Sequence, residues 1–266
     1  MFGFPKVDYS IRDSFKQNFL RTVIVQIKFE QTDALFKNKN KILSDFQERY
    51  PRLNDNVSNN FQIQINKNET PIVNTSKGKG FVLKSLDGNR SVNFTENIVE
   101  ININGNSYKD FSEILDFEIN KIIKLFLELN ISVVNRLAIR KINIIGVGIN
   151  ENTTLTQISK NLLNEKIGFS FDCFPMEELI QQNINTINYL KDNDGLNIRI
   201  GHAIPQQGLQ IQNSKVGHII CDIDRYNIAS IESNRISEVL SSINEEIFDV
   251  FLWFLNDNSL KILKNE

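Results

Sequence analysis

Cysteine and histidine are scarce in this sequence of 266 residues, which contains two of each. Cys173 and Cys221 lie far apart, and a disulfide scaffold or a zinc site would need more thiols. Long apolar runs are also lacking, because no window approaches the roughly 20 apolar residues that a membrane-spanning helix needs. The first residues do not have the pattern of a secretory signal. We therefore expect a soluble protein of the reducing cytoplasm that does not contact a membrane.

An excess of charge of one sign is lacking too. The chain has 30 Lys and Arg against 32 Asp and Glu, a formal net charge of -2, so no basic field attracts nucleic acid. Nucleic acid is therefore not indicated as a partner. Apolar residues make up 41% of the chain and charged residues 23%, which is ordinary for a globular protein with one large or two smaller domains. The 36 Asn and 4 Ala are typical of an AT-rich bacterial genome.

Catalytic motifs are missing as well. Gly78-Lys79-Gly80 and Gly146-Val147-Gly148 lack the other positions of a phosphate-binding loop. The sequence has no Gly-x-Ser-x-Gly nucleophile elbow and no zincin helix. No cofactor is indicated, and a non-enzymatic interaction or regulatory protein is favoured over an enzyme.

Hydrophobic periodicity predicts alternating strands and helices. Alternation typical of half-buried strands occurs at 20–30, 61–65, 132–145, 167–174, 184–190, 196–204 and 216–224. The segment 81–103 predicts a hairpin that turns at Asp87-Gly88, and Asp194-Gly195 predicts a second such turn. Helical spacing occurs at 37–50, 110–129 and 231–256, with Asp110 and Glu113 in capping positions of the second helix, while the polar residues 51–60 are expected to form a loop.

The order of these elements predicts an α+β fold with an internal duplication. Residues 98–130 and 219–256 both contain a strand, a polar loop and a long amphipathic helix. We expect two related helix-grip-like halves, 1–150 and 151–266, each an antiparallel sheet with a short and a long helix. This order also resembles TATA-binding-protein-like architectures, an analogy of fold that carries no function.

Several short segments along the chain match a family signature. They are VQIKF ending at Phe29, FQERYP ending at Pro51, RLAIRKINII at residues 136–145, CDIDRY from Cys221, and FLWFLND from Phe251. Together they resemble an uncharacterised, sporadically distributed bacterial family of proteins about this long, with the signatures RxGLRYINxI and DIDV. The chain departs from the first signature at Ala138 and Lys141, where the family has Gly and Tyr. The resemblance covers most of the chain and implies the mixed fold, a bacterial setting and mobile or defence-related gene neighbourhoods, but no activity.

Three residues form a candidate ligand site. Arg136 and Arg140 lie four residues apart on one predicted strand and so share a face. They are either anion contacts for a small ligand or nucleotide in the cleft of the sheet, or structural ion pairs with Asp222 or Glu100. Arg140 and Asn143 also match the family's Arg and Asn, which makes them the residues to test first.

A candidate metal site lies on a later predicted strand. His218, Asp222 and Asp224 have even spacing, so they share a face, and a histidine with two carboxylates can hold a divalent cation of a metal-dependent hydrolase. The alternative is a solvated polar strand face, which is common in antiparallel sheets. A Cys-His pair of His202 with Cys173 or Cys221 is conceivable, but both cysteines sit in apolar strands and resemble inert core residues.

The last helix carries a candidate interface. Around Phe251, Trp253 and Phe254 the helix is apolar on nearly its whole circumference, wider than one buried stripe requires. Such a surface is either enclosed in the core or contacts a protein partner or a second copy of the chain. We therefore expect an interaction or regulatory protein with a protein partner or a homodimer, with a small-ligand or nucleotide sensor as the first alternative.

Overall fold

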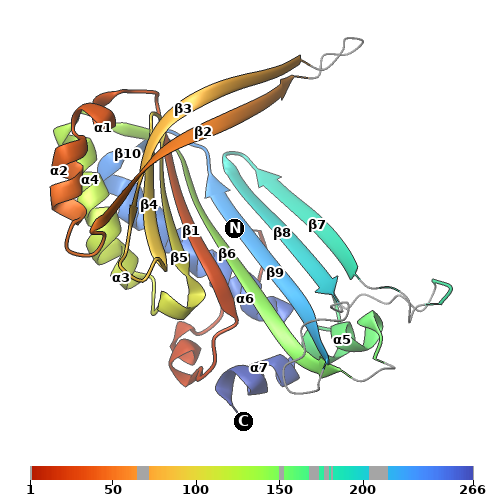
Figure 1. Cartoon of the computed structure of the whole chain (residues 1–266). Helices are drawn as coiled ribbons and strands as arrows, with labels where there is room; N and C mark the ends of the chain where they lie inside the picture. Colours follow the sequence, from red (N-terminus) through yellow and green to blue (C-terminus); the bar gives the residue numbers. More distant parts are fainter. Residues whose placement is uncertain are drawn as a thin grey trace. The chain divides into compact units, whose positions relative to one another are not determined.

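The structure of the chain is a computed structural model that describes residues 2–64, 72–149, 153–167, 174–176, 180, 182–203 and 215–265 (Figure 1). Side chains at 55–64, 72–78, 147, 149, 203 and 215–216 are outside this description. Over the described residues the chain forms a ten-stranded sheet and seven α-helices. The expected mixed α and β fold is confirmed, and its strands form a large antiparallel sheet. The predicted strand at 167–174 falls almost entirely outside the described residues, as does Cys173.

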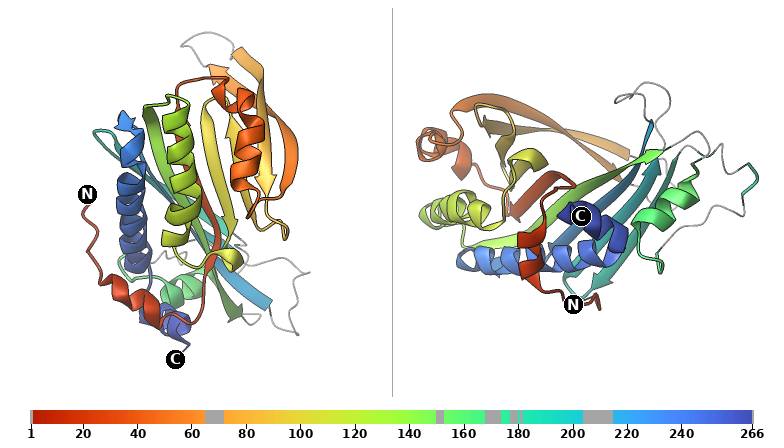
Figure 2. Two further views of the ribbon diagram at one scale, coloured as in Figure 1. Left: turned by 90° about the vertical axis from the view of Figure 1, so that its left-hand side faces the viewer. Right: turned by 90° about the horizontal axis from the view of Figure 1, so that it is seen from below.

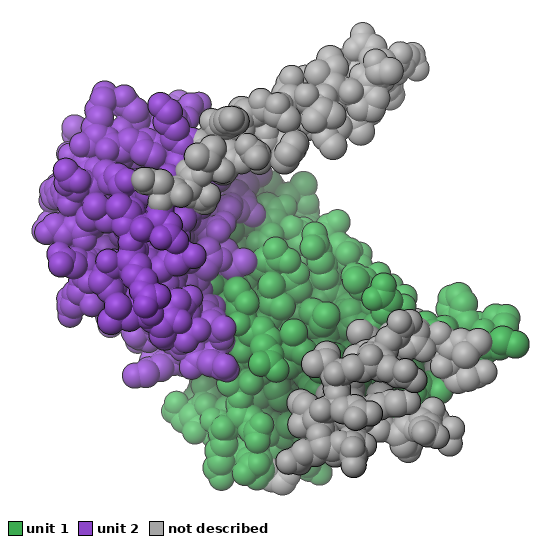
Figure 3. Space-filling model, in the orientation of Figure 1, with its two compact units in different colours: residues 1–23, 138–227, 240–266 green, residues 24–137, 228–239 purple. Residues whose placement is uncertain are grey.

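The chain forms two compact units, each assembled from separate stretches of sequence (Figure 3). Unit 1 contains Met1–Val23, Ala138–Asn227 and Leu240–Glu266, and unit 2 contains Ile24–Leu137 and Ile228–Val239. Strands β1 (Leu20–Phe29) and β6 (Val133–Ile149) and helix α6 (Ile236–Phe254) each contribute residues to both units.

The hydrogen-bonded strand order is β2-β3-β4-β5-β1-β6-β9-β8-β7, with β10 paired to β6. The remaining strands are β2 (Arg52–Gln64), β3 (Ile72–Lys84), β4 (Arg90–Thr95), β5 (Ile98–Asn104), β7 (Gln182–Lys191), β8 (Asp194–Ala203), β9 (Lys215–Asn227) and β10 (Ile231–Glu232). The expectation of a loop at 51–60 is wrong. These polar residues continue β2, because β3 pairs with them antiparallel from Arg52 opposite Lys84 onwards and supplies their backbone hydrogen bonds.

The two predicted hairpin turns have different outcomes. The first lies where Asp87-Gly88 predicts it, between β3 and β4, with Gly88 at a φ of 74°. The second lies two residues before the predicted Asp194-Gly195, because Lys191 already pairs with Asp194 and Asp192 adopts the left-handed φ of 53°. Glycine at position 195 instead makes room for the Tyr226 ring, since a Cβ atom there would lie 2.0 Å from Cζ of that ring.

Unit 2 packs its helices against strands of the sheet, with Phe126 against Phe29 of β1 and Phe46 against Phe94 of β4. These helical elements are α1 (Ala34–Lys37), α2 (Lys39–Phe46), α3 (Ser112–Ile114), a π-helical turn η3 (Leu115–Ile119) and α4 (Asn120–Glu128). Helices α2 and α4 contact each other and lie side by side (Figure 2). Asp110 accepts a hydrogen bond from the Glu113 backbone N–H at 3.0 Å, as the capping pattern predicts. Fully buried residues such as Ile27, Phe29, Phe94, Ile122 and Phe126 form its core.

Unit 1 contains helices that the sequence predicted only in part. The predicted helix at 231–256 is α6, preceded by the short strand β10 and a 3-10 turn, and α7 (Asp257–Lys264) follows it. Helix α5 (Leu155–Leu162), which contacts β8, β9 and α7, was missed, although Thr154 and Gln157 form a capping box at its start. No helix among the described residues combines the length and hydrophobicity of a membrane span.

Candidate functional site: the groove at the end of helix α6

The N-terminal strap, residues 2–9, lies along the second half of α6 in unit 1 and is anchored on Asp249. This carboxylate is only 3% exposed and accepts hydrogen bonds from the Val7 backbone N–H at 3.2 Å and from the Tyr9 hydroxyl at 3.3 Å. The Lys6 amine lies 3.5 Å from it. Burial, and secondly the negative charge of Asp249, raise the pKa of Tyr9. The strap is therefore fixed at one point by both a backbone and a side-chain donor.

The strap covers part of the predicted interface. Phe4 packs edge-on against Trp253 with ring centroids 5.1 Å apart, and both Phe2 and Phe4 contact the ring of Tyr189. Phe251 and Phe254 are 8% and 1% exposed, so these two predicted interface residues belong to the core. Trp253 alone of the three is half-buried at the surface. Residues around nearly the whole circumference of α6 are apolar because other segments of the same chain pack against this helix from more than one side.

An open groove of about 590 Å³ adjoins this strap. Its walls are the strap, the 3-10 helix η1 (Tyr9–Ser14), the end of α6 and α7. It is lined by Pro5, Val7, Asp8, Ser10, Ile11, Ser14, Leu252, Trp253, Leu260 and Lys264. Most of these side chains are apolar, and a volume of this size falls in the range of ligand and peptide sites.

Local hydrogen bonds shape the groove. The backbone N–H groups of Lys16 and Gln17 donate to the Leu263 carbonyl at 2.8 and 2.9 Å, which ties the segment after η1 to α7. The Asp8 side chain caps η1 by accepting from the Ser10 N–H at 3.0 Å, and this bond lowers the pKa of Asp8. The lining thus combines mainly apolar side chains with Asp8 and Lys264, which carry opposite charges. This arrangement suits binding of an apolar group.

The three predicted ligand-binding residues contact protein groups. In unit 1, Arg140 donates to both carboxylate oxygens of Asp222, at 2.7 and 2.6 Å, and the Asn143 amide donates to the Cys221 carbonyl at 3.4 Å. In unit 2, Arg136 donates to the side chain of Gln26. The first two contacts join the segments RLAIRKINII and CDIDRY.

The predicted metal-site residues lie on β9 in unit 1. Asp222 pairs with Arg140, while Asp224 accepts a hydrogen bond from the Asn197 amide at 3.3 Å. Burial, and secondly the charge of Arg21, lower the pKa of His218. Across the part of the chain that the structure describes, no three His, Cys, Asp or Glu side chains gather as a possible metal site. Cys221 is buried, and burial raises the pKa of its thiol, as in an inert core cysteine.

Sequence reasoning missed two buried ionic networks. In unit 1, Arg225 is 3% exposed and donates to Asp194 at 2.6 Å and to Glu246 at 2.7 Å. Its guanidinium also lies over the Phe2 ring of the strap, 5.2 Å from the centroid. The sequence feature that could have revealed this network is Arg225 in the segment CDIDRY. That segment was interpreted only as a strand.

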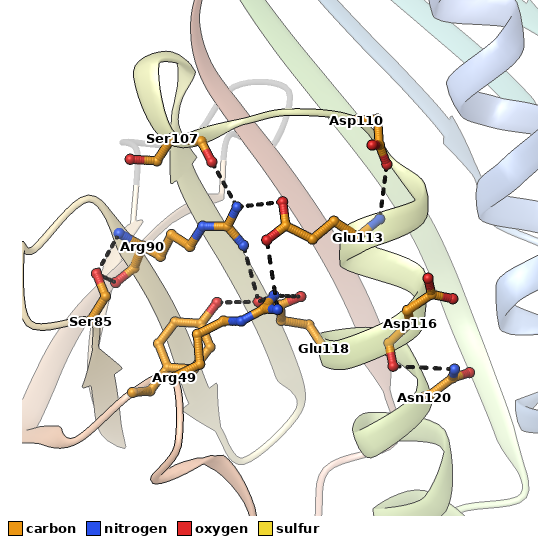
Figure 4. A network of polar contacts seen from close by, with 10 residues as sticks. Arg49, Ser85, Arg90, Ser107, Asp110, Glu113, Asp116, Glu118 and Asn120 are labelled. Carbon is orange, nitrogen blue, oxygen red and sulfur yellow. Dashed lines mark hydrogen bonds and ion pairs between the residues drawn. The ribbon is translucent and has the colours of Figure 1, made fainter.

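The second network lies in unit 2 around Glu118, a fully buried residue of the π-helical turn η3 (Figure 4). It accepts from Arg49 at 3.0 Å and from the Tyr50 hydroxyl at 2.5 Å, and Arg90 lies 3.7 Å away. Arg90 also donates to Glu113 at 2.8 Å. Two arginines and two glutamates balance in charge, so the network is suited to holding the segment after α2, the start of β4, α3 and η3 together. It gives Arg49 and Tyr50 of the segment FQERYP a structural role.

Comparison of the sequence with protein-family models and with curated proteins found no match.

Proposed function

We propose that the protein is a non-enzymatic interaction or regulatory protein that binds an apolar, extended segment of a partner protein in the groove beside Trp253. The observation that carries this proposal is the groove itself, about 590 Å³ in volume and lined mainly by apolar side chains that include the only tryptophan of the chain.

The strap supports the choice of partner. It is an extended segment whose Phe4 ring lies against Trp253 and whose backbone donates to Asp249. The same end of α6 therefore already holds a short aromatic segment of the chain itself. A partner segment of similar chemistry would extend this packing into the groove, and each large side chain that it fully buries contributes about 1.5–3 kcal/mol.

The experiment uses purified proteins encoded by the neighbouring genes, tested one at a time by calorimetry. We expect one of them to bind, and Leu260→Ala to weaken that binding at least about tenfold, a loss of about 1.4 kcal/mol. Leu127→Ala is the matched control, because Leu127 is an exposed leucine of α4 in unit 2. Binding that is equally tight in both variants would remove the groove from the proposal.

A small-ligand or nucleotide sensor is the alternative that the groove volume favours. It predicts that a nucleotide or another small molecule raises the melting temperature of the wild-type protein and that Leu260→Ala abolishes this shift. In that outcome the groove is a ligand pocket and the partner proposal fails. A metal-dependent hydrolase at His218 lacks comparable support, because Asp222 is already held by Arg140.

We also propose that the chain consists of two related helix-grip-like halves. Counted outward from β1, the strand order is β1-β5-β4-β3-β2, and counted outward from β6 it is β6-β9-β8-β7. In each half a strand precedes one or two short helices, then four antiparallel strands in the first half and three in the second, and then a long helical segment. Superposition of residues 20–128 on 133–254 in an experimental structure tests this, and unrelated paths of the two segments would contradict it.

The cellular setting is a further part of this proposal. Scarce cysteine and the family resemblance support a component of a cytoplasmic bacterial system of the defence or toxin–antitoxin type. Deletion of the gene alone and together with its neighbours tests the assignment, since loss of an antitoxin is tolerated only when the toxin is removed as well.

A further inference from the structure

Strand β7 ends the strand order of the sheet, and among the described residues only β8 pairs with it. Its register with β8 is uninterrupted from Gln182 opposite Ala203 to Lys191 opposite Asp194. One row of backbone N–H and C=O groups of β7 therefore faces outward, and such edges readily pair with another chain.

Within its own ten residues, β7 lacks the sequence features that usually protect an edge strand. Natural edges carry prolines, charged side chains or bulges, or are very short. This strand is ten residues long, contains no proline, and its only ionisable side chains are those of Tyr189 and the terminal Lys191. Three of its large apolar side chains are instead exposed, with exposed fractions of 66% for Ile184, 36% for Ile187 and 71% for Leu190.

The spacing of these side chains is symmetric. Ile184 and Leu190 each lie three residues from Ile187. Side chains alternate between the two faces of a strand, so Ile184 and Leu190 share one face, while Ile187 shares the other with Tyr189. A two-fold axis perpendicular to the sheet and midway between the Ile187 residues of two copies would place Ile184 opposite Leu190 of the other copy, twice, and Ile187 opposite its own counterpart.

We propose that two copies of this chain form a homodimer by antiparallel pairing of their β7 strands about Ile187. Such an isologous contact is self-complementary, and all three exposed apolar side chains become cross-strand pairs, which stabilise antiparallel sheets. It brings no like charges together, since Lys191 falls opposite Asn183 of the second copy. No residue of β7 lines the groove beside Trp253, although Phe4 of the strap contacts both Tyr189 of β7 and Trp253. The dimer is therefore tested separately from the partner proposed for the groove.

Sedimentation equilibrium on the full chain tests the dimer. The wild type is expected to be dimeric at micromolar concentration, and Ile187→Lys is expected to raise the dissociation constant at least about tenfold, because two ammonium groups would meet at the axis. Leu127→Lys, at an exposed leucine of α4, and Leu260→Ala, in the groove, are expected to leave the dimer intact. A monomeric wild type, or a dimer that survives Ile187→Lys, would overturn the proposal.

Cysteine cross-linking tests the register with milder substitutions. On a Cys173→Ser background, which leaves the buried Cys221 in place, Ile187→Cys is expected to form a disulfide-linked dimer on a non-reducing gel. Ile184→Cys alone should not cross-link, whereas the double variant Ile184→Cys, Leu190→Cys should. Equal cross-linking of Ile184→Cys and Ile187→Cys would contradict the proposed axis.

Discussion

Arg140 on β6 and Asp222 on β9 form a two-pronged ion pair, with Nε 2.7 Å from Oδ1 and Nη2 2.6 Å from Oδ2. The pair joins the segments RLAIRKINII and CDIDRY, which lie far apart in the sequence. Arg140 therefore has a structural role. A phosphate would need the same two guanidinium N–H groups that already donate to the Asp222 carboxylate.

We expect Arg140→Met to lower the free energy of unfolding by about 2–3 kcal/mol, because Asp222 is only 7% exposed and would keep its charge without its partner. Arg235→Met is the control, since Arg235 pairs with Glu238 at the surface and exposed pairs contribute about 1 kcal/mol or less. Urea denaturation measures both. Equal losses in the two variants would show that Asp222 does not depend on Arg140.

The second prediction concerns the strap, and Trp253 fluorescence reports on it because the chain has one tryptophan. Phe4→Ala removes the ring that lies 5.1 Å from the indole. We expect a red-shifted emission and stronger acrylamide quenching, since water replaces the ring. Phe2→Ala is the matched control, because Phe2 contacts Tyr189. A spectrum that changes equally in both variants would mean that the whole strap detaches.

The third prediction concerns the pH dependence of stability. Burial, and secondly the neighbouring charge of Arg12, lower the pKa of Lys141 from 10.5 to about 7. Between these values the unfolded chain holds a proton that the folded chain has lost. This group therefore makes stability rise with pH across that window, by at most about 1.4 kcal/mol per pH unit.

Lys141→Met should flatten the curve of unfolding free energy against pH between about 7 and 10.5. Urea denaturation at a series of pH values measures it. The same substitution at the exposed Lys16 should leave the slope unchanged. A wild-type curve that coincides with that of Lys141→Met would show that the amine titrates at its ordinary pKa.

The fourth prediction concerns the buried network of unit 2. Glu118→Gln keeps the shape of the side chain but removes the charge that faces Arg49 and Arg90, and we expect a loss of stability on the order of 3 kcal/mol. Asp116→Asn is a control on the same π-helical turn, because Asp116 is exposed, and its effect should stay within about 0.5 kcal/mol. Thermal and urea unfolding measure the two variants. A neutral Glu118→Gln would mean that the arginines find other acceptors.

Local patterns in the sequence determined much of the fold. The alternation at residues 20–30 became β1, and the long repeat at 231–256 became α6. Asp110 caps the helical segment that its spacing with Glu113 predicts. These features depend on neighbours within a few residues, which is the range over which periodicity, capping and turn chemistry act. The same reasoning identified Arg140, Asn143 and Asp222 as residues worth attention.

The tertiary structure decided what those residues do. Arg140 and Asp222 lie 82 positions apart, and Val7 and Asp249 lie 242 positions apart, so no local pattern relates them. The polar stretch at 51–60 became a strand because β3 lies beside it, and Phe251 and Phe254 became core residues because distant segments enclose α6. Burial and ion pairing arise from contacts between segments far apart in the chain, and those contacts form only when the sheet brings the segments together.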